Sequence, residues 1–396
     1  MTRGQEIAAP IARTGVPCSI GASDADPATA PPTTDGPTLT TERIHLKRPA
    51  ATEPRQLLAR YFVPIVTVHL LALLVFVPAL FSWTGVILCV AGVHVFGQTI
   101  TMGYHRLLAH RSFATPLWFE HVLVVGALCC LEDSPARWIA THRMHHAHSD
   151  EEDDPHTPLV TFLWGHLWWI LVRNRELHHR TNYDRYARDI LRDPFYMWIE
   201  KNAWSPLWFY MAQVAVYAAA GFGAALLWTD AVGAAWFAAS VVVWGVYART
   251  VLVWHITWSV NSLTHLFGYR NHDTEENSRN NWVVALFAAG EGWHNNHHAD
   301  PACCTVQHRW WEVDVTYWEL RALSLVGLTS QLNPRREVRA AEAVARAQAA
   351  RAQAKPTNTQ AAGESAVAGI AAAAAGAGVG NRSQAAIQAS PGSSNT

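Results

Sequence analysis

The chain has 396 residues, of which 50% are apolar and only 15% are charged, well below the roughly 25% that is usual for soluble domains. Its formal net charge of -1 provides no basic excess, so nucleic acid is not expected as a partner. The six cysteines include no CxxC pair, which argues against a zinc ribbon or a thiol redox centre, and their two adjacent pairs do not make a disulfide framework.

The N-terminal segment precedes a series of long apolar stretches. Residues 1–41 are rich in Ala, Pro, Thr and Gly without a secretory signal, so disorder is predicted there. Apolar stretches follow at 61–81, 83–104, 206–228 and 231–254, each close to the ~20 residues that cross a bilayer as a helix. Because each pair is joined by only a few residues, the sequence predicts an all-α integral membrane protein with four transmembrane helices in two hairpins. Four buried helices of a large soluble protein are the alternative.

The distribution of Lys and Arg predicts the orientation of these helices. Basic residues occur before residue 61 and throughout the segment between the two pairs, whereas the two hairpin tips contain none. By the positive-inside rule, both termini and the middle segment should face the cytoplasm, as in a bacterial inner membrane. We therefore expect one membrane domain at 42–332, with a cytoplasmic helical cap, followed by an Ala-rich low-complexity tail at 333–396.

Histidines are concentrated in three short boxes on the predicted cytoplasmic side. The boxes are HRLLAH at 105–110, HRMHH at 142–146 and HNNHH at 294–298. Neutral imidazole is the commonest metal ligand in proteins. Because the boxes have mixed spacing and lie inside the chain, an expression tag or a low-complexity tract explains them poorly. They predict a metal centre that is held by ligands from several helices.

The spacing within the boxes indicates more than one metal ion. His142 shares a helix face with His145 and His146, whereas His145 and His146 diverge from each other by about 100°. This divergence suits ligands of two different ions, and the third box repeats it. His105 and His110 are five residues apart, so a regular helix would rotate His110 away from His105, and a bend or a helix end is expected between them.

The last apolar stretch adds another candidate pair. Its end, WSVNSLTH, places Asn261 and His265 four residues apart and therefore on one helix face. One zinc ion would use only three or four ligands and a bis-histidine haem only two, so nine histidines suit two ions. Imidazole alone does not choose between zinc, copper, iron and nickel. The nine candidates are His105, His110, His142, His145, His146, His265, His294, His297 and His298.

The three boxes, together with NSxxH before the third, resemble those of the membrane fatty-acyl desaturases, and most closely the acyl-CoA desaturases that act between carbons nine and ten. The resemblance extends from about residue 61 to about residue 326 and includes DPH at 154–156 and GYR at 268–270. It implies an oxidoreductase that uses a non-haem di-iron centre and dioxygen to insert a cis double bond into a long-chain acyl thioester. It also implies that the nine histidines bind two iron ions, and that Asn261 contacts one of them through water.

The chemistry agrees with iron, because removal of hydrogen from an unactivated methylene needs a strong oxidant and zinc has no redox chemistry. The residues at 132–135, EDSP, depart from the animal-type pattern. The carrier of the acyl chain therefore stays open between coenzyme A, acyl carrier protein and a whole lipid. The extra His148 is expected to lie outside the ligand set. Because the chain contains neither HPGG nor CxxxxCxxC, we expect a separate ferredoxin or b-type cytochrome, with its reductase, as electron donor.

The acyl tail is expected to enter a narrow apolar tunnel that includes Trp138 and Trp258. Gly97 precedes His105 by eight residues, or about 12 Å along a helix, which is roughly the length of the distal half of an eighteen-carbon chain. Gly97 is therefore a candidate for the closed end of the tunnel, and close helix packing is the alternative. Two rival functions stay open. One is a hydroxylase or ketolase of the same di-iron class, and the other is a metal transporter or haem protein with ligands inside the membrane spans.

Overall fold

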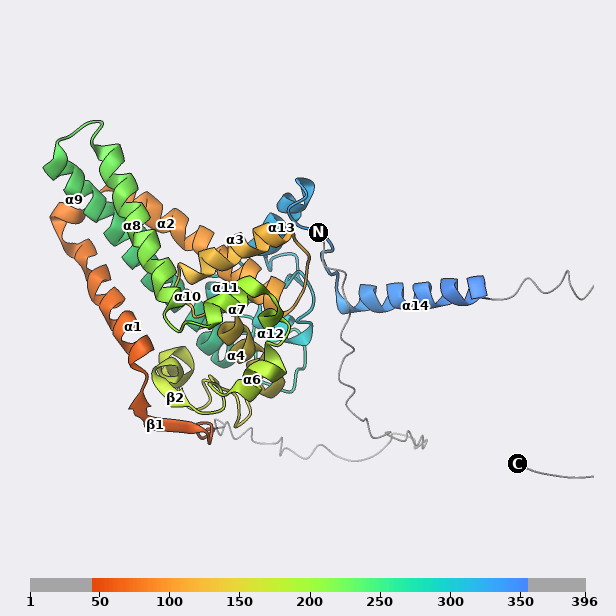
Figure 1. Cartoon of the computed structure of the whole chain (residues 1–396). Helices are drawn as coiled ribbons and strands as arrows, with labels where there is room; N and C mark the ends of the chain where they lie inside the picture. Colours follow the sequence, from red (N-terminus) through yellow and green to blue (C-terminus); the bar gives the residue numbers. More distant parts are fainter. Residues whose placement is uncertain (1–44, 355–396) are drawn as a thin grey trace, which may run out of the picture. The chain divides into compact units, whose positions relative to one another are not determined.

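A computed structural model of the chain describes residues 45–354 (Figure 1). The segment 1–41, for which disorder is predicted, lies outside these residues, as does the tail beyond residue 354. The chain divides into two compact units, of which the first ends at Arg336 and the second begins at Glu337. The described residues of the second unit belong to α14 (Arg336–Ala354), an Ala- and Arg-rich helix whose side chains are largely exposed.

Four helical stretches are long and apolar enough to cross a membrane, as expected of a membrane protein. They are α1 (Ala59–Ala72) with η1 (Leu73–Phe76); α2 (Trp83–Gln98) with η3 (Thr99–Ala109); α8 (Ser205–Ala225); and α9 (Ala231–Val242) with η6 (Val243–Ala248) and α10 (Arg249–Leu266). The second and fourth stretches contain 27 and 36 residues. At 1.5 Å per residue they are about 40 and 54 Å long, against about 30 Å for the bilayer core, so both extend beyond it.

The four stretches pack as neighbours in the first unit. α8 and α9 lie side by side (Figure 1) and are joined by the short segment 226–230. Asp230 begins α9 by accepting a backbone hydrogen bond at 2.8 Å. Ser82 begins α2 in the same way, at 3.0 Å, and its hydroxyl also contacts the Ser240 hydroxyl at 2.7 Å. The last stretch packs against both α1 and α2, so it connects the two pairs of helices.

The remaining described residues of the first unit form short helices and one small sheet, in which β1 (Thr52–Leu57) pairs antiparallel with β2 (Val172–Asn174). The short helices are η2 (Pro78–Leu80), α3 (Leu117–Leu128), α4 (Pro135–His148), η4 (Trp164–Trp168), α5 (Trp169–Leu171), α6 (Arg180–Tyr186), η5 (Ile190–Arg192), α7 (Pro194–Glu200), α11 (Trp282–Phe287), α12 (His294–Ala299) and α13 (Val315–Leu325). One apolar core joins η3, α3, α4, α7 and α13 through the buried side chains of Tyr104, Leu128, Ile139, Ile199 and Leu320. This core fixes η3 and α4, which contain the first two histidine boxes, relative to each other.

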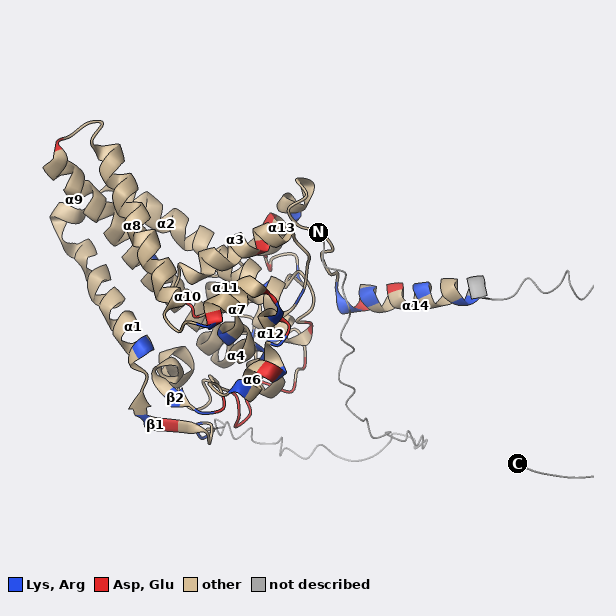
Figure 2. Cartoon of the chain, viewed as in Figure 1, with Lys and Arg blue, Asp and Glu red and all other residues tan. Residues whose placement is uncertain are grey.

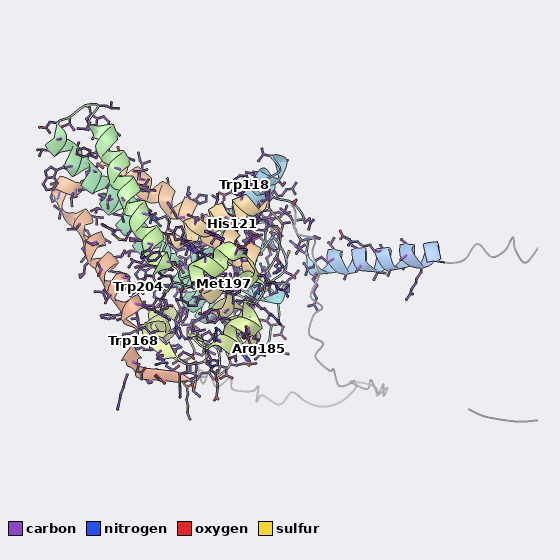
Figure 3. All side chains as sticks on the ribbon, viewed as in Figure 1. Trp118, His121, Trp168, Arg185, Met197 and Trp204 are labelled. Carbon is purple, nitrogen blue, oxygen red and sulfur yellow. The ribbon has the colours of Figure 1, made fainter. Side chains whose placement is uncertain are left out.

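Charged residues are distributed unevenly over the first unit (Figure 2). α8, α9 and most of α1 contain almost none, whereas Lys, Arg, Asp and Glu gather around α4, α6 and α12. Large apolar side chains are exposed on the long helices, and so are tryptophans near their ends, among them Trp83 on α2 and Trp204 before α8, of which Figure 3 labels Trp204. Exposed apolar helices with tryptophans near their ends are typical of a protein in contact with lipid.

Candidate metal centre

The nine histidines of the sequence prediction gather in two groups, although they come from four segments of the chain. In each group, one ring nitrogen of every histidine lies within 4.8 Å of the others. The five-histidine group contains His105, His110, His142, His146 and His297. The four-histidine group contains His145, His265, His294 and His298. The structure therefore brings all nine together as two candidate sites for metal ions.

The neighbouring residues His145 and His146 belong to different groups, as the helical geometry of α4 predicts. His146 follows His142 by four residues and lies close to the same helix face. His145 lies about 100° away from His146 around the helix axis. α12 repeats the division, because His297 joins the five-histidine group while His294 joins the other group. Two short helices thus each supply ligands to both sites.

The first histidine box begins inside a helix and ends just beyond it. η3 is a π-helix that ends at Ala109, so a helix end lies between His105 and His110, as expected. A π-helix pairs residues five apart, and the backbone N–H of His110 donates to the carbonyl oxygen of His105 at 3.1 Å. The two imidazoles therefore lie on one face, with ring centroids 4.8 Å apart. The wider turn, which the spacing alone does not reveal, brings both histidines into the five-histidine group.

The ring nitrogens face one another at distances that fit a shared metal ion. In the five-histidine group the Nε2 atoms of His105 and His297 are 3.1 Å apart, and those of His297 and His146 are 3.0 Å apart. Two nitrogens that lie about 2.1 Å from one ion are about 3.0 Å apart at a ligand angle near 90°, and about 3.4 Å apart at a tetrahedral angle. The spacing is therefore short enough for these nitrogens to share one ion.

Three buried nitrogens of the four-histidine group have no hydrogen-bond partner among the described residues. They are Nε2 of His145, Nε2 of His265 and Nδ1 of His294. Burial of an unpaired polar atom is costly, so partners are expected at this place. A metal ion bound by the Nε2 atoms of His145 and His265 would satisfy both of them, and the donor set therefore fits a second ion.

Carboxylates hold the opposite nitrogen of several of these histidines. Nδ1 of His105 is 2.7 Å from Glu291, Nδ1 of His145 is 2.9 Å from Asp154, and Nδ1 of His265 is 2.8 Å from Asp150. This arrangement places the proton on Nδ1 and directs the lone pair of Nε2 toward the centre of each group. Sequence reasoning assigned no role to Asp150 or Glu291, although the acidic run DEEDD after the second box and Glu291 just before the third box are visible signals.

Glu291 belongs to a buried network of ion pairs. The Arg106 guanidinium donates to Glu291 at 2.7 Å and to Asp314 at 2.9 Å. Burial raises the pKa of Glu291, but Arg106 and His105 outweigh it and lower this pKa to about 2. Glu291 is therefore ionised at neutral pH. A charged network of this kind fixes the position of His105 in the absence of solvent.

The surroundings of six of these histidines favour the neutral form of the imidazole. Burial lowers the pKa of six of them, and the neighbouring imidazoles lower it further. These six are His110, His142, His146, His294, His297 and His298. A neutral imidazole keeps a lone pair for a metal, so the electrostatics agree with ligation.

Two other residues named from the sequence lie outside the groups. His148 is at the end of α4 and contacts Glu151 at 3.3 Å and Tyr186, away from both groups. Asn261 lies on α10, four residues before His265, and lines two cavities next to the centre. His156 of the DPH stretch is buried and stacks on His145 with ring centroids 4.3 Å apart.

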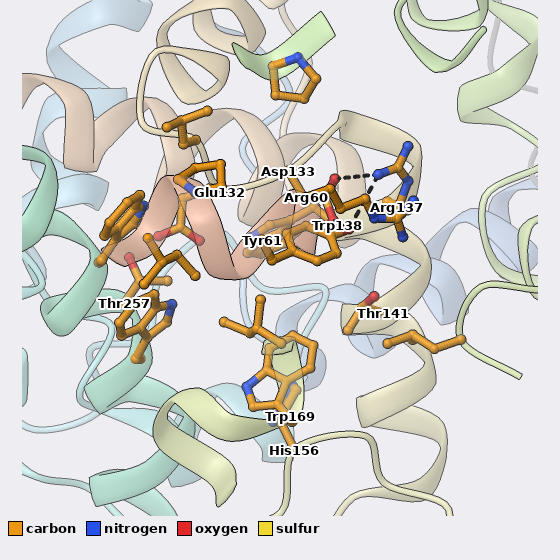
Figure 4. Close-up of a pocket in the computed structure, with 18 of the residues that line it drawn as sticks. Arg60, Tyr61, Glu132, Asp133, Arg137, Trp138, Thr141, His156, Trp169 and Thr257 are labelled. Atoms are coloured by element: carbon orange, nitrogen blue, oxygen red, sulfur yellow. Dashed lines mark hydrogen bonds and ion pairs between the residues drawn. The ribbon is translucent and has the colours of Figure 1, made fainter. Parts of the chain in front are cut away.

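The two cavities meet beside the histidines. The first extends from Arg60 and Arg137 to His142, and Figure 4 shows its labelled wall residues, including Tyr61, Trp138 and Thr257. The second is lined by Gly97, Ile100 and Val253, among others. Both share a small set of lining residues, namely Trp138, His142, Thr257 and Asn261. A chain-like molecule that occupies both cavities would therefore pass the metal centre.

The three residues proposed for the tunnel all line these cavities. Trp138 lines both, Trp258 lines the first, and Gly97 lines the second. A Cβ added at Gly97 would meet no atom within 4 Å, so no neighbouring helix needs a glycine there. This observation favours the tunnel interpretation of Gly97 over the packing interpretation.

Comparisons with known proteins point to one family. The model of the family described as "Fatty acid desaturase" matches residues 81–328. The chain is 40% identical over 266 residues to the sn-1 stearoyl-lipid 9-desaturase of Anabaena variabilis, which covers 67% of this chain and 89% of that protein. It is 39% identical over 266 residues to the sn-2 palmitoyl-lipid 9-desaturase of Nostoc sp. (strain 36), covering 67% and 86%. It is 31% identical over 271 residues to the acyl-CoA C20 Delta5-desaturase of Anemone leveillei, covering 68% and 80%.

Proposed function

Because the chain belongs to the fatty acid desaturase family, we propose that it inserts a cis double bond between carbons 9 and 10 of a long acyl chain. Desaturation of fatty acyl chains, an oxidoreductase reaction, is the activity of the family. The names of the relatives that are about 40% identical support the carbon position. The observation that carries the proposal is the meeting of two cavities at Trp138 and His142, beside the two histidine groups.

We further propose that each histidine group binds one iron ion. The facing Nε2 atoms of the five-histidine group and the unpartnered nitrogens of the four-histidine group support this proposal. Bound iron would supply, with dioxygen, the oxidising power that an unactivated methylene requires. Formation of the double bond removes two hydrogens from the substrate, and reduction of dioxygen to two waters needs two further electrons and protons. A separate donor, a ferredoxin or a b-type cytochrome with its reductase, is therefore part of the proposal.

The residues of this chain would position the acyl chain and exclude water. In the proposed arrangement the carboxyl half occupies the first cavity and the methyl half occupies the second. Trp138 and Thr257 lie at the junction and hold the reacting methylenes beside His142. Asn261, at the same junction, is proposed to contact one metal ion through water.

The carrier of the acyl chain is proposed to be a membrane lipid. The sequence alone favoured a thioester, but relatives that are about 40% identical are named for action on stearoyl or palmitoyl lipids. The relative from Anemone leveillei is named for acyl-CoA, which keeps the thioester as the second candidate. Both carriers present the acyl chain to the same two cavities.

The membrane arrangement completes the proposal. We propose that the four candidate spans form two hairpins and that the histidine-bearing segments form a cap on the cytoplasmic side. His105 and His265 lie near the ends of their helical stretches rather than near the middle. This position supports chemistry at the membrane surface and disfavours a transporter or haem protein with ligands at the bilayer midplane.

The decisive experiment is expression in a host that lacks unsaturated fatty acids, followed by mass analysis of its total fatty acids. We expect new eighteen- or sixteen-carbon acids with a double bond after carbon nine. A product that contains additional oxygen would instead identify a hydroxylase or ketolase. An unchanged fatty acid profile from correctly inserted, iron-loaded protein would contradict the proposed function.

A further inference from the structure

Arg60 in the wall of the first cavity has no ion-pair partner among the described residues. Its side chain is half-buried in α1, and its Nε is buried without a hydrogen-bond partner in the same part of the chain. Its guanidinium contacts the ring of Tyr61, with 4.8 Å between Cζ and the ring centroid. Figure 4 shows Arg60 beside Tyr61, Asp133 and Arg137. Partly buried charges in proteins are usually paired, so this guanidinium is suited to an anionic ligand.

Asp133, a carboxylate in the same cavity wall, is engaged by other groups. It pairs with Arg137 at 3.0 Å and accepts a hydrogen bond from the Tyr61 hydroxyl at 2.6 Å. Asp133 is therefore committed to Arg137, and the charge of Arg60 is left without a carboxylate of its own among the described residues.

The remaining carboxyl of the cavity does not supply the missing charge. Burial raises the pKa of Glu132 to about 8, so this side chain is largely neutral at pH 7. His178 also lines the cavity, and its Nδ1 contacts the carbonyl oxygen of Asn174 at 2.7 Å, which leaves its Nε2 free for a ligand. An anion beside Arg60 would therefore meet a cation and polar groups, and the charge of the nearby Asp133 is offset by its ion pair with Arg137.

Arg60 lies at the depth where lipid head groups are found. It is the second residue of the candidate span Ala59–Phe76, and a charged residue at the end of a span lies near the polar surface of the bilayer. Trp204 lines the same cavity and is 51% exposed, so the cavity reaches the surface there. Trp is itself enriched at the membrane–water interface. An acyl chain in the cavity would thus place its head group near Arg60.

We propose that Arg60 binds a phosphate of the substrate's head group and so makes the enzyme selective for phosphate-bearing acyl carriers. The planar guanidinium matches phosphate geometry with two parallel hydrogen bonds, which gives both affinity and orientation. This inference rests on the proposed function, because it names the head group of the same substrate. A phospholipid in the bilayer and a soluble acyl-CoA both supply such a phosphate, and the experiment below separates them.

The test uses the iron-loaded full chain in detergent with an equimolar mixture of distearoyl phosphatidylglycerol and distearoyl monogalactosyl diacylglycerol. Lipid that stays bound after purification is quantified by mass spectrometry. For the wild type we expect at least about tenfold more phosphatidylglycerol than galactolipid, because hydrogen bonds to charged groups contribute about 1.5–3 kcal/mol, or roughly 10- to 150-fold. Stearoyl-CoA is then added as competitor. Displacement of phosphatidylglycerol by it identifies acyl-CoA as a second source of the phosphate.

Variants of Arg60 test the inference directly. Arg60→Gln should bring the ratio of the two lipids close to one while galactolipid binding is unchanged, and Arg60→Lys should restore part of the preference. Arg55→Gln is the matched control, because Arg55 is an exposed residue on β1 that does not line the cavity, and it should leave the ratio as in the wild type. Iron content equal to that of the wild type shows that each variant is folded.

Two outcomes would overturn the inference. One is a wild type that binds both lipids equally, and the other is an Arg60→Gln variant that loses both lipids to the same extent. Neither outcome would contradict the proposed desaturation, which is measured separately by the appearance of double bonds in the fatty acids of the host. Absence of desaturation there would refute the proposed function, whatever the lipid ratios are.

Discussion

At the scale of single residues, the centre depends on which ring nitrogen of each histidine is directed inward. Carboxylates hold Nδ1 of His105, His145 and His265, so Nε2 of each is left for a ligand. Neighbouring residues could then serve different ions, because His145 and His146 belong to different groups. A side chain that is one position away along α4 is therefore not equivalent to its neighbour.

The single variants His145→Ala and His146→Ala should each lose one of the two proposed irons. Wild-type protein from iron-replete cells should contain about two irons per chain, and each variant about one, with loss of turnover in both. Elemental analysis of the purified proteins measures this. His148→Ala, on the same helix but outside both groups, should keep both irons and its activity. A full iron complement in His145→Ala or His146→Ala would contradict the assignment.

Gly97 is the residue for which tunnel and packing roles differ most clearly. Because a side chain there meets open space in the second cavity, Gly97→Leu should fold and still desaturate, but should prefer sixteen-carbon over eighteen-carbon chains. Product ratios from mixed substrates, read by gas chromatography, measure the preference. Gly223→Leu is the control, because it also enters open space but lies on α8 outside both cavities. An unchanged ratio in folded Gly97→Leu would remove Gly97 from the tunnel.

At the scale of elements, one loop after α4 orients two histidines of the four-histidine group. Asp154 accepts hydrogen bonds from the backbone N–H of Asp150 at 2.9 Å and of His156 at 3.0 Å, which closes the loop. The same loop then orients His145 through Asp154 and His265, on α10, through Asp150. Asp150 has φ of 59°, a left-handed conformation that an aspartate tolerates better than most residues. The loop thus couples α4 to the end of the last membrane helix.

Asp154→Asn should weaken the four-histidine site without removing a ligand. The amide is a poorer acceptor than the carboxylate for the Nδ1–H of His145, and residues in this position typically change metal affinity or activity by about 10- to 100-fold. Iron retention during dialysis against a chelator, together with turnover, measures the effect. The exposed neighbour Asp153 provides the control as Asp153→Asn, which should behave as the wild type. Equal retention in both variants would show that Asp154 does not support the metal.

At the scale of the whole molecule, apolar helices and a charged, histidine-rich region occupy different parts of the first unit (Figures 1 and 2). The two cavities lie where these parts meet, because their walls combine residues of the spans, such as Ile65 and Val253, with residues of α4. A substrate with an apolar tail and a polar head group has this same division. The position of the centre between lipid and water is therefore suited to the proposed chemistry.

An even number of candidate spans among the described residues predicts that the segments before the first span and after the last lie on one side of the membrane, and the distribution of Lys and Arg predicts that this side is the cytoplasm. Fusion of green fluorescent protein to the C-terminus should therefore give fluorescent cells, because this reporter does not fold in the periplasm. Alkaline phosphatase inserted in the segment 226–230 should be active, because it matures only in the periplasm. Active phosphatase at the C-terminus would contradict the predicted orientation.

The sequence by itself determined the family, the presence of four long apolar helices and the identity of the nine histidines. These features are local, because apolar runs and residue spacing are properties of short segments. It also predicted that His145 and His146 diverge, since helical rotation depends only on the separation of residues along the chain. The helix end expected between His105 and His110 is present at Ala109, but the π-helical turn that brings the two rings to one face was not predicted, because a π-helix and an α-helix cannot be distinguished from this spacing.

Only the tertiary structure decided which histidines share a site and which charged groups contact them. His105 meets His297, 192 residues later in the chain, and Arg106 meets Asp314 across 208 residues. Such contacts depend on how η3, α4 and α12 pack around a common core, and no local pattern specifies that packing. The same holds for the cavities and for the unpaired Arg60, because a missing partner is visible only when every neighbour has been placed.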